Sequence, residues 1–348
     1  MAIFKNNRGS WTCKFYYTDW AGRRKQKKKE GFKTKKDARD FEIKFLNNCR
    51  TDVDMTFETL VKAYMSDCNA RLKPTTCASK EHIIRTKLMP YFKDTPINSI
   101  DVAKVRKWQN EIITSPKNYA PTYQKAIHNQ LSAILNYAIK CYGLGINAAA
   151  KCGSMGRKNA EKMQFWTVSE FQQFIKTVDN PTTKMIFNLL FYSGIREGEL
   201  LALTIDDFDF CNNTVSINKS YARLNGQDII QEPKTPKSKR IVSLPRPIMK
   251  MILEYSKKQK ISGRIFKVTK NHLHREMDKY SELAQVKRIR IHDLRHSYAS
   301  MLIELGTPPL EIQERLGHED IQTTLNTYSH LYPNKHFETD IKLEKFII

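Results

Sequence analysis

The second half of this 348-residue chain carries a set of side chains suited to chemistry at a phosphate. Arg196 lies in the segment G-I-R-E-G-E-L, Arg295 ends H-D-L-R, His318 ends L-G-H, and Tyr328 lies in N-T-Y-S-H. A guanidinium group is planar and permanently charged, so two of them can hold an anionic phosphate. Imidazole groups transfer protons, and a phenol that has lost its proton is a nucleophile. The set therefore predicts a site that binds a phosphate and transfers protons, with a phenol that could act as a nucleophile.

Helices are expected to position these groups. His292 and Arg295 are three residues apart, which places them on one face of a helix. Tyr298 and Leu302 continue that helix along an apolar stripe, and Gly306 is expected to end it. Tyr298 is therefore predicted to be a core residue and not the nucleophile.

The following helix is expected to place His318. Thr307 is predicted to be its N-cap and Pro308 its first residue. Gly317 is expected to end it, which leaves His318 just outside the helix. Histidine at a helix C-terminus also suits the helix dipole, so His318 alone would be weak evidence for a site.

A mixed, mostly α domain with a small antiparallel sheet is predicted over residues 166–335. Thr167 and Glu170 form a capping-box pattern that opens it, before apolar positions at helical spacing. Short strands are expected at 214–218 and 240–244. Glu199, in the first motif, is predicted to pair locally or to cap a helix.

Two further domains are predicted upstream. Residues 56–150 have helical periodicity throughout and suggest an all-α domain; its clearest stripe is Ile127, Gln130, Leu131, Ile134, Leu135 and Ala138. Residues 151–165 are expected to be a linker, because the apolar period disappears before them and charged residues follow.

The first 50 residues form a strongly basic unit. They contain 15 Lys or Arg against 5 Asp or Glu, a local net charge of 15 − 5 = +10. Alternation over 11–17, a turn at 19–22 and a second basic strand predict a small sheet, and Thr34 with Asp37 predicts the cap of one helix. The basic cluster is expected to bind DNA, although a solvated charge run or a localisation tag is the alternative; it comprises Arg23, Arg24, Lys25, Lys27, Lys28 and Lys29.

Composition points to a polyanionic partner. Lys and Arg outnumber Asp and Glu by 59 to 36, and the net charge is +23. Nucleic acid is the first candidate and an anionic membrane surface the second. The chain contains no apolar run of about 18 residues and no signal segment, which argues against the membrane. Its seven cysteines are scattered, with no C-x-x-C pair, so free thiols in the cytoplasm are expected.

The four motifs, in this order and spacing, resemble the signature of the tyrosine recombinases. The resemblance is most specific from Arg196 to Tyr328. It implies that Arg196 and Arg295 hold the phosphate, that His318 donates a hydrogen bond to it, and that His292 assists Tyr328. The tyrosine would form a 3′-phosphotyrosine, which conserves bond energy, so that neither metal nor nucleotide cofactor is required.

The family also places a lysine in a β-hairpin to protonate the leaving oxygen. The segment E-P-K-T-P-K-S-K-R offers Lys234, Lys237 and Lys239. Lys234 is favoured because its Lys-Thr pair before the strand resembles the family pattern, but the choice among the three stays open.

The resemblance extends to domain layout and partners. It implies an arm-type DNA-binding domain at 1–50, a core-binding domain at 56–150, a catalytic domain at 166–335, and a tail at 336–348 that docks on another subunit. The implied activity is integration and excision of a mobile element by a homo-tetramer on double-stranded DNA, bound at core and arm sites. A DNA-bending factor and an excision factor are the implied helpers, and the site of action is the nucleoid. The alternatives are an inactive DNA-binding regulator of the same fold and, less favoured, a monomeric type IB topoisomerase.

Overall fold

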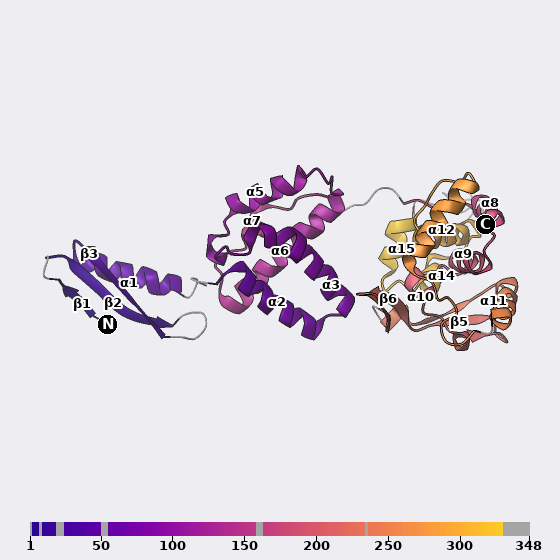
Figure 1. Ribbon diagram of the computed structural model, residues 1–348, viewed down its shortest axis with the longest axis horizontal. Helices are drawn as coiled ribbons and strands as arrows, with labels where there is room; N and C mark the ends of the chain where they lie inside the picture. Colours follow the sequence, from indigo (N-terminus) through magenta and orange to yellow (C-terminus); the bar gives the residue numbers. More distant parts are fainter. Residues whose placement is uncertain are drawn as a thin grey trace, which may run out of the picture. The chain divides into compact units, whose positions relative to one another are not determined.

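The protein is described from a computed structural model over residues 2–6, 9–18, 24–49, 55–157, 163–233, 236–259 and 261–329. Arg23, Lys234 and the predicted tail at 336–348 lie outside these described residues. The chain divides into two units, Met1–Glu161 and Lys162–Ile348, and each is described by itself (Figure 1).

The first unit begins with an antiparallel sheet of three strands, with β2 in the centre. Its elements are β1 (Ala2–Lys5), β2 (Trp11–Thr18), β3 (Arg24–Phe32) and helix α1 (Lys35–Cys49). Alternation in β2 buries Cys13 and Phe15 against α1, which lies along the sheet in Figure 1. Thr34 and Asp37 cap α1 reciprocally, as predicted. Strand β1 was not predicted, because four residues are too few to show a period.

A helical bundle follows in the same unit, as the periodicity predicted. Its elements are α2 (Phe57–Arg71), α3 (Pro74–Ile83), the π-helix η1 (Ile84–Leu88), α4 (Met89–Phe92), the 3₁₀ turn η2 (Ile97–Ser99), α5 (Val102–Ile113), α6 (Pro121–Tyr142) and α7 (Ala148–Cys152). The predicted stripe on α6 is buried in the core with Phe57, Phe92 and Trp108. Gly143, with φ of 72°, ends α6 in the left-handed conformation.

The second unit is mostly helical and carries two small sheets. Its helices are α8 (Val168–Thr177), α9 (Pro181–Ser193), α10 (Glu197–Leu200), α11 (Arg246–Gln259), α12 (Lys270–Leu283), α13 (Asp293–Glu304), α14 (Pro309–Leu316) and α15 (Ile321–Tyr328), with 3₁₀ turns η3 (Ile205–Asp207) and η4 (Pro236–Ser238). Strands β4 (Phe208–Asp209), β5 (Thr214–Ile217) and β8 (Arg240–Ser243) form one antiparallel sheet. The Thr167 and Glu170 capping box is present, as predicted.

A second hairpin, β6 (Ser220–Leu224) with β7 (Gln227–Gln231), was not predicted. Its turn is Asn225-Gly226, and both residues have positive φ, 50° and 81°. Asn-Gly is the strongest short hairpin signal, because a type I′ turn needs positive φ at both central positions. The signal was therefore in the sequence.

The predicted start of α14 was wrong by one residue. Pro308 is the N-cap, Pro309 is the first helical residue, and no side chain caps the helix. Thr307 instead closes α13: its N–H donates to the carbonyl of Leu302 at 2.9 Å, and the N–H of Gly306 donates to Ile303. These two bonds form a Schellman motif, so Thr307 belongs to the end of one helix and not to the beginning of the next.

Candidate active site

Arg196 lies at the N-cap of α10, two residues after the left-handed Gly194 that ends α9. Its Nη1 donates to Oε1 of Glu199 at 2.8 Å, and its main-chain N–H donates to Oε2 at 2.9 Å. Glu199 is only 3% exposed, whereas 36% of the Arg196 side chain is exposed. Glu199 thus has the local pairing role predicted for it, and it holds Arg196 while leaving part of the guanidinium open to a ligand.

Arg295 lies on α13 and is almost fully buried. Its Nη1 donates to the carbonyl of Gly194 at 2.8 Å, and its Nη2 donates to the carbonyl of Leu316. Burial, followed by the positive charges of Arg196 and Arg240, lowers the pKa of Arg295. Three cationic groups held this close together favour an anion, because a bound phosphate would offset their mutual repulsion.

His318 is fixed by a second Schellman motif. Its N–H donates to the carbonyl of Gln313 at 3.1 Å, and that of Gly317 donates to Glu314 at 3.0 Å. Its Nδ1 lies 2.8 Å from the hydroxyl of Thr324 on α15. Burial, followed by the charges of Arg295 and Arg196, lowers its pKa to about 3. His318 is therefore neutral near pH 7, and when Nδ1 accepts from Thr324 its proton lies on Nε2, where it can be donated.

Tyr328 is the last residue of α15 and is 1% exposed. Its hydroxyl lies 2.7 Å from Nδ1 of His296. Burial raises its pKa to about 12, opposed by the charge of Arg295. Burial, followed by the charge of His292, lowers the pKa of His296 to about 4. The phenol is thus neutral, and the neutral imidazole beside it can accept its proton.

The histidine within hydrogen-bond distance of the Tyr328 hydroxyl is His296, and among the described residues no hydrogen bond joins His292 to Tyr328. His292 is the N-cap of α13, one residue before the helix, and its ring packs edge-on against that of His296 with centroids 5.4 Å apart. The resemblance gave the assisting role to His292 and not to His296. The sequence did contain a signal, because His296 follows His292 at a spacing of four residues, one helical turn.

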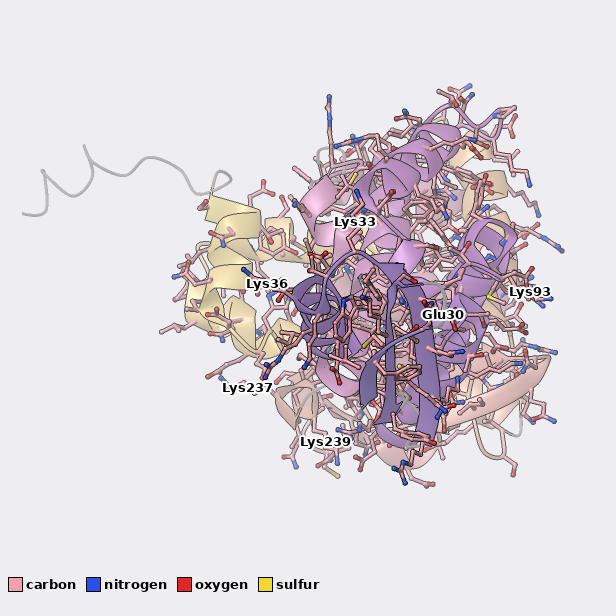
Figure 2. The ribbon with its side chains drawn as sticks, turned by 90° about the vertical axis from the view of Figure 1, so that its left-hand side faces the viewer. Glu30, Lys33, Lys36, Lys93, Lys237 and Lys239 are labelled. Atoms are coloured by element: carbon pink, nitrogen blue, oxygen red, sulfur yellow. The ribbon has the colours of Figure 1, made fainter. Side chains whose placement is uncertain are left out.

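The candidate lysines lie in residues 232–239, between β7 and β8, hereafter the lysine loop. The structure describes this loop except for Lys234 and Thr235. Lys237 donates to the carbonyl of Glu319 at 2.9 Å, next to His318, and Lys239 forms an ion pair with Glu232 at 2.9 Å. Both lysines are exposed (Figure 2).

The predicted basic cluster of the first unit is a row of exposed side chains on β3; those described are Arg24, Lys25, Lys27, Lys28 and Lys29. Aromatic rings support several of them: the guanidinium of Arg24 lies 4.5 Å from the Tyr16 ring centroid, and Lys29 lies 4.5 Å from that of Phe41. Cation–π contacts hold long cationic side chains in extended positions while leaving them able to meet a polyanion. The exposed Lys33 and Lys36 add to the positive charge of the same sheet-and-helix element (Figure 2).

Within the described part of the chain, no group of three His, Cys, Asp or Glu side chains is arranged to hold a metal ion. Among the helices described, none is long and apolar enough to cross a membrane.

Models of three known domains match this chain. The chain matches the Phage integrase family over residues 164–335, the Phage integrase N-terminal SAM-like domain over 56–113, and an Arm DNA-binding domain over 3–49. It is 27% identical to the ICEBs1 integrase of Bacillus subtilis, over 90% of this chain and 91% of that protein. It is 24% identical to a XerC-like tyrosine recombinase of Caldanaerobacter subterraneus, over 87% and 88% of the two chains.

Solved structures share the fold. The Tn1549 transposon integrase in complex with a circular intermediate DNA has a TM-score of 0.67 at 19% identity, over 84% of this chain and all of that one (100%). A lambda integrase tetramer bound to a Holliday junction has a TM-score of 0.62 at 14% identity, over 96% and 95%. The matched family models and the integrase and recombinase relatives define an enzyme that breaks and rejoins DNA strands at specific sites. The chain belongs to the phage integrase family of tyrosine recombinases, and the mobile-element integrases are its relatives.

Proposed function

We propose that Tyr328 is the nucleophile of this recombinase and that Arg196, Arg295 and His318 hold the phosphate that it attacks. The observation that carries the proposal is the chain of contacts through Gly194 and Leu316. Arg295 binds both carbonyls, one of them two residues before Arg196 and the other two residues before His318. Two motifs that lie 101 and 21 residues away along the chain are thereby tied to one buried arginine. His318 in turn contacts Thr324 on the tyrosine helix α15.

The reaction would proceed in one displacement. The Tyr328 oxygen forms a bond to phosphorus, the bond from phosphorus to the 5′ oxygen breaks, and the product is a 3′-phosphotyrosine. The phenol proton passes to a histidine, with His296 at hydrogen-bond distance and His292 beside it. The arginines and His318 stabilise the negative charge that the non-bridging oxygens gain. Rejoining is the reverse reaction with the 5′ hydroxyl of a second strand.

Lys234 is the lysine that we assign to the leaving oxygen. Lys237 and Lys239 already hold protein acceptors, a main-chain carbonyl and a carboxylate. In the sequence, Lys234 precedes these two lysines and is followed by Thr235. It would donate a proton to the 5′ oxygen as the bond to phosphorus breaks.

The DNA contacts are proposed from charge and layout. We assign arm-site binding to the β3 row of cations within residues 1–50 and core-site binding to the helical domain at 56–150, with 166–335 as the catalytic domain and 151–165 as the linker. By analogy with the lambda integrase tetramer on a Holliday junction, we propose that the working form is a homo-tetramer on DNA. The substrate then places the protein on the nucleoid in the cytoplasm, where a bending factor and an excision factor would set its direction.

The segment at 336–348 is proposed to dock on a neighbouring copy. It ends in Phe346-Ile347-Ile348 and lies outside the described residues. The second unit offers an apolar groove of about 410 Å³ as acceptor, lined in part by Tyr192, Leu244, Tyr298, Met301, Leu302 and Leu305. Leu305 is 74% exposed there, which favours cover by an apolar segment.

A suicide substrate tests the central assignment. A duplex from the ends of the element, nicked close to the cleavage point, releases a short strand after attack and so traps the covalent complex. Wild-type protein is expected to form a protein–DNA adduct that survives denaturation, and Tyr328→Phe is expected to bind the duplex equally well without forming it. An adduct with Tyr328→Phe would show that another residue attacks, and no adduct with the wild type would favour an inactive DNA-binding regulator.

A further inference from the structure

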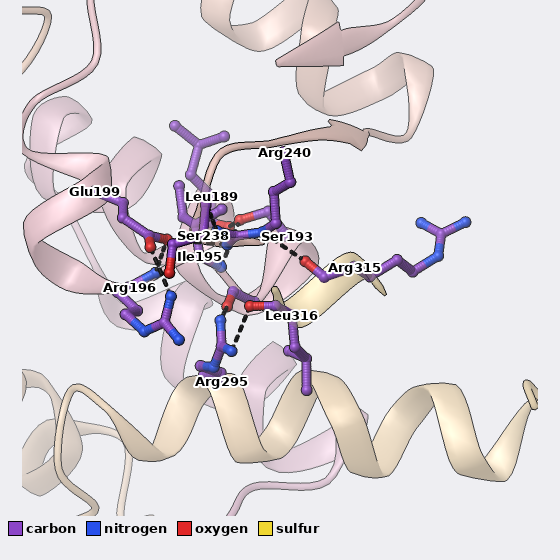
Figure 3. Close-up of polar contacts among 11 residues, drawn as sticks. Leu189, Ser193, Ile195, Arg196, Glu199, Ser238, Arg240, Arg295, Arg315 and Leu316 are labelled. Atoms are coloured by element: carbon purple, nitrogen blue, oxygen red, sulfur yellow. Dashed lines mark hydrogen bonds and ion pairs between the residues drawn. The ribbon is translucent and has the colours of Figure 1, made fainter. Parts of the chain in front are cut away.

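Arg240 is a buried arginine that the four motifs do not include. It begins β8, directly after the lysine loop, and only 6% of its side chain is exposed. Nη2 donates to Oε2 of Glu199 at 2.9 Å, Nε to the carbonyl of Arg315 at 2.9 Å, and Nη1 to the carbonyl of Ser238 at 3.1 Å. Figure 3 shows Arg240 among these partners. All three nitrogens are thus engaged with protein, in three directions.

The first direction leads to Arg196. Oε2 of Glu199 is shared between Arg240 and the main-chain N–H of Arg196, while Oε1 holds the Arg196 guanidinium. Burial alone would raise the pKa of Glu199, but the charge and hydrogen bond of Arg240, then those of Arg196, lower it. Arg240 therefore keeps Glu199 ionised, and the ionised carboxylate sets the orientation of Arg196.

The second direction leads to Arg295 and His318. Arg240 holds the carbonyl of Arg315, and the next carbonyl, that of Leu316, accepts from Arg295. Gly317 has φ of 65°, and a Cβ there would lie 2.8 Å from Cδ of Arg240. The Arg240 side chain is thus packed against Gly317, the residue that precedes His318.

The third direction leads to the lysine loop. The carbonyl of Ser238, near the end of the loop, accepts from Arg240. One residue earlier in the loop, Lys237 donates to the carbonyl of Glu319, the residue after His318. The lysine loop is therefore held at its end by Arg240, and it contacts residues 315–319, hereafter the His318 segment.

We infer that Arg240 is a positioning residue that holds Arg196, the His318 segment and the lysine loop in one arrangement around the phosphate. The inference rests on the proposed roles of Arg196, Arg295 and His318. Only an arginine suits this position, because a planar guanidinium directs donors to three sides, whereas the ammonium of lysine is a single point. A displacement of about 1 Å in a reacting group can cost about 10²-fold in rate.

The test is single-turnover cleavage of the nicked duplex by the full chain at saturating protein. Arg240→Ala and Arg240→Lys are each expected to lower the cleavage rate by about 10²-fold, the cost of misplaced catalytic groups. The Kd for the intact duplex should change little, because Arg240 binds only protein. A second substrate carries a methylphosphonate, which is neutral, at the cleaved position. The loss caused by Arg240→Lys is expected to shrink on it, because a phosphate without charge depends less on the placement of Arg196 and Arg295.

Arg264→Ala is the matched control. Arg264 is also partly buried and binds a carboxylate, Asp228, and a carbonyl, that of Leu201, but has no described contact to Glu199 or Arg315. It should give the same rate ratio between the two substrates as the wild type.

An equal loss on both substrates with Arg240→Lys would overturn the inference, since general damage to the domain does not depend on substrate charge. A rate unchanged from the wild type would also overturn it. Failure of the proposed function has a different signature: the wild type forms no adduct, or Tyr328→Phe still forms one.

Discussion

The hydroxyl of Tyr328 lies 2.7 Å from Nδ1 of His296, and both groups are neutral in the DNA-free protein. The tyrosine is 1% exposed, so solvent hydroxide has little access to it. The nucleophile therefore depends on a neighbouring histidine for the loss of its proton. The two candidates lie at the start of α13: His292 is its N-cap and His296 is in its first turn.

The pH dependence of cleavage should identify the acceptor. If His296 takes the proton, the wild-type rate is expected to be nearly flat from about pH 6 to pH 9, because an imidazole well above its pKa is already the free base. The rate should fall as the pH approaches the His296 pKa of about 4, where the protonated ring can no longer accept. Single-turnover cleavage across this range is the measurement.

Two asparagine variants distinguish the histidines. His296→Asn keeps a polar partner for the phenol but cannot take its proton, so its rate should be low and should rise with pH, toward the raised pKa of Tyr328 of about 12. His292→Asn should keep the flat profile. If His292→Asn gives the rising profile instead, the role implied by the family resemblance belongs to His292.

Two glycines of the same backbone conformation test the packing of Arg240 against Gly317. Gly306 and Gly317 have φ of 77° and 65°, but an added Cβ meets nothing within 4 Å at Gly306. Gly306→Ala is expected to lower the free energy of unfolding by about 1 to 2 kcal/mol, the cost of left-handed backbone for an L-residue. Gly317→Ala should cost more, because its Cβ must also displace the fastened Arg240, and it should slow cleavage. Urea unfolding measures the difference; equal costs would contradict the packing argument.

Glu199 should link stability to pH. Its pKa is lowered in the folded protein, so its stabilising contribution is present above the unfolded value of about 4.3 and is lost as the pH falls through the folded value. Glu199→Gln should therefore be destabilised relative to the wild type near pH 7, and the gap should narrow on acidification. Unfolding in urea at several pH values measures this, with Glu254→Gln, at a 66% exposed side chain, as the control that should show little effect.

The salt dependence of arm-site binding should reveal the β3 cations. Replacing Lys25, Lys27 and Lys29 by Gln is expected to reduce the slope of log K against log salt by about 2.7, because each lost phosphate contact removes about 0.9. Fluorescence anisotropy with the arm-site duplex gives the slope. Lys250→Gln, at a 78% exposed lysine of α11, should leave it unchanged.

The sequence by itself determined the class of the protein and most of its elements. Local signals decided these features: the Thr167 and Glu170 capping box, the helical stripe of α6, and the glycines that end α9, α13 and α14. Such signals are properties of neighbouring residues, so they can be read without the fold. At Thr307-Pro308-Pro309 the prediction from sequence was wrong, because the end of α13 and the start of α14 lie in the same few residues. Thr307 could either cap α14 or close α13, and the structure shows that it closes α13.

Only the tertiary structure decided how the site is held together. The hydrogen bonds of Arg295 to Gly194 and Leu316 span 101 and 21 residues, and those of Arg240 to Glu199 and Arg315 span 41 and 75. No local sequence pattern indicates which residues these two arginines bind, because most of their partners are main-chain carbonyls, which every residue possesses. The packing of α15 on α13 likewise decides that His296 is the neighbour of Tyr328. The two residues are 32 positions apart in the sequence, so no local pattern indicates their contact.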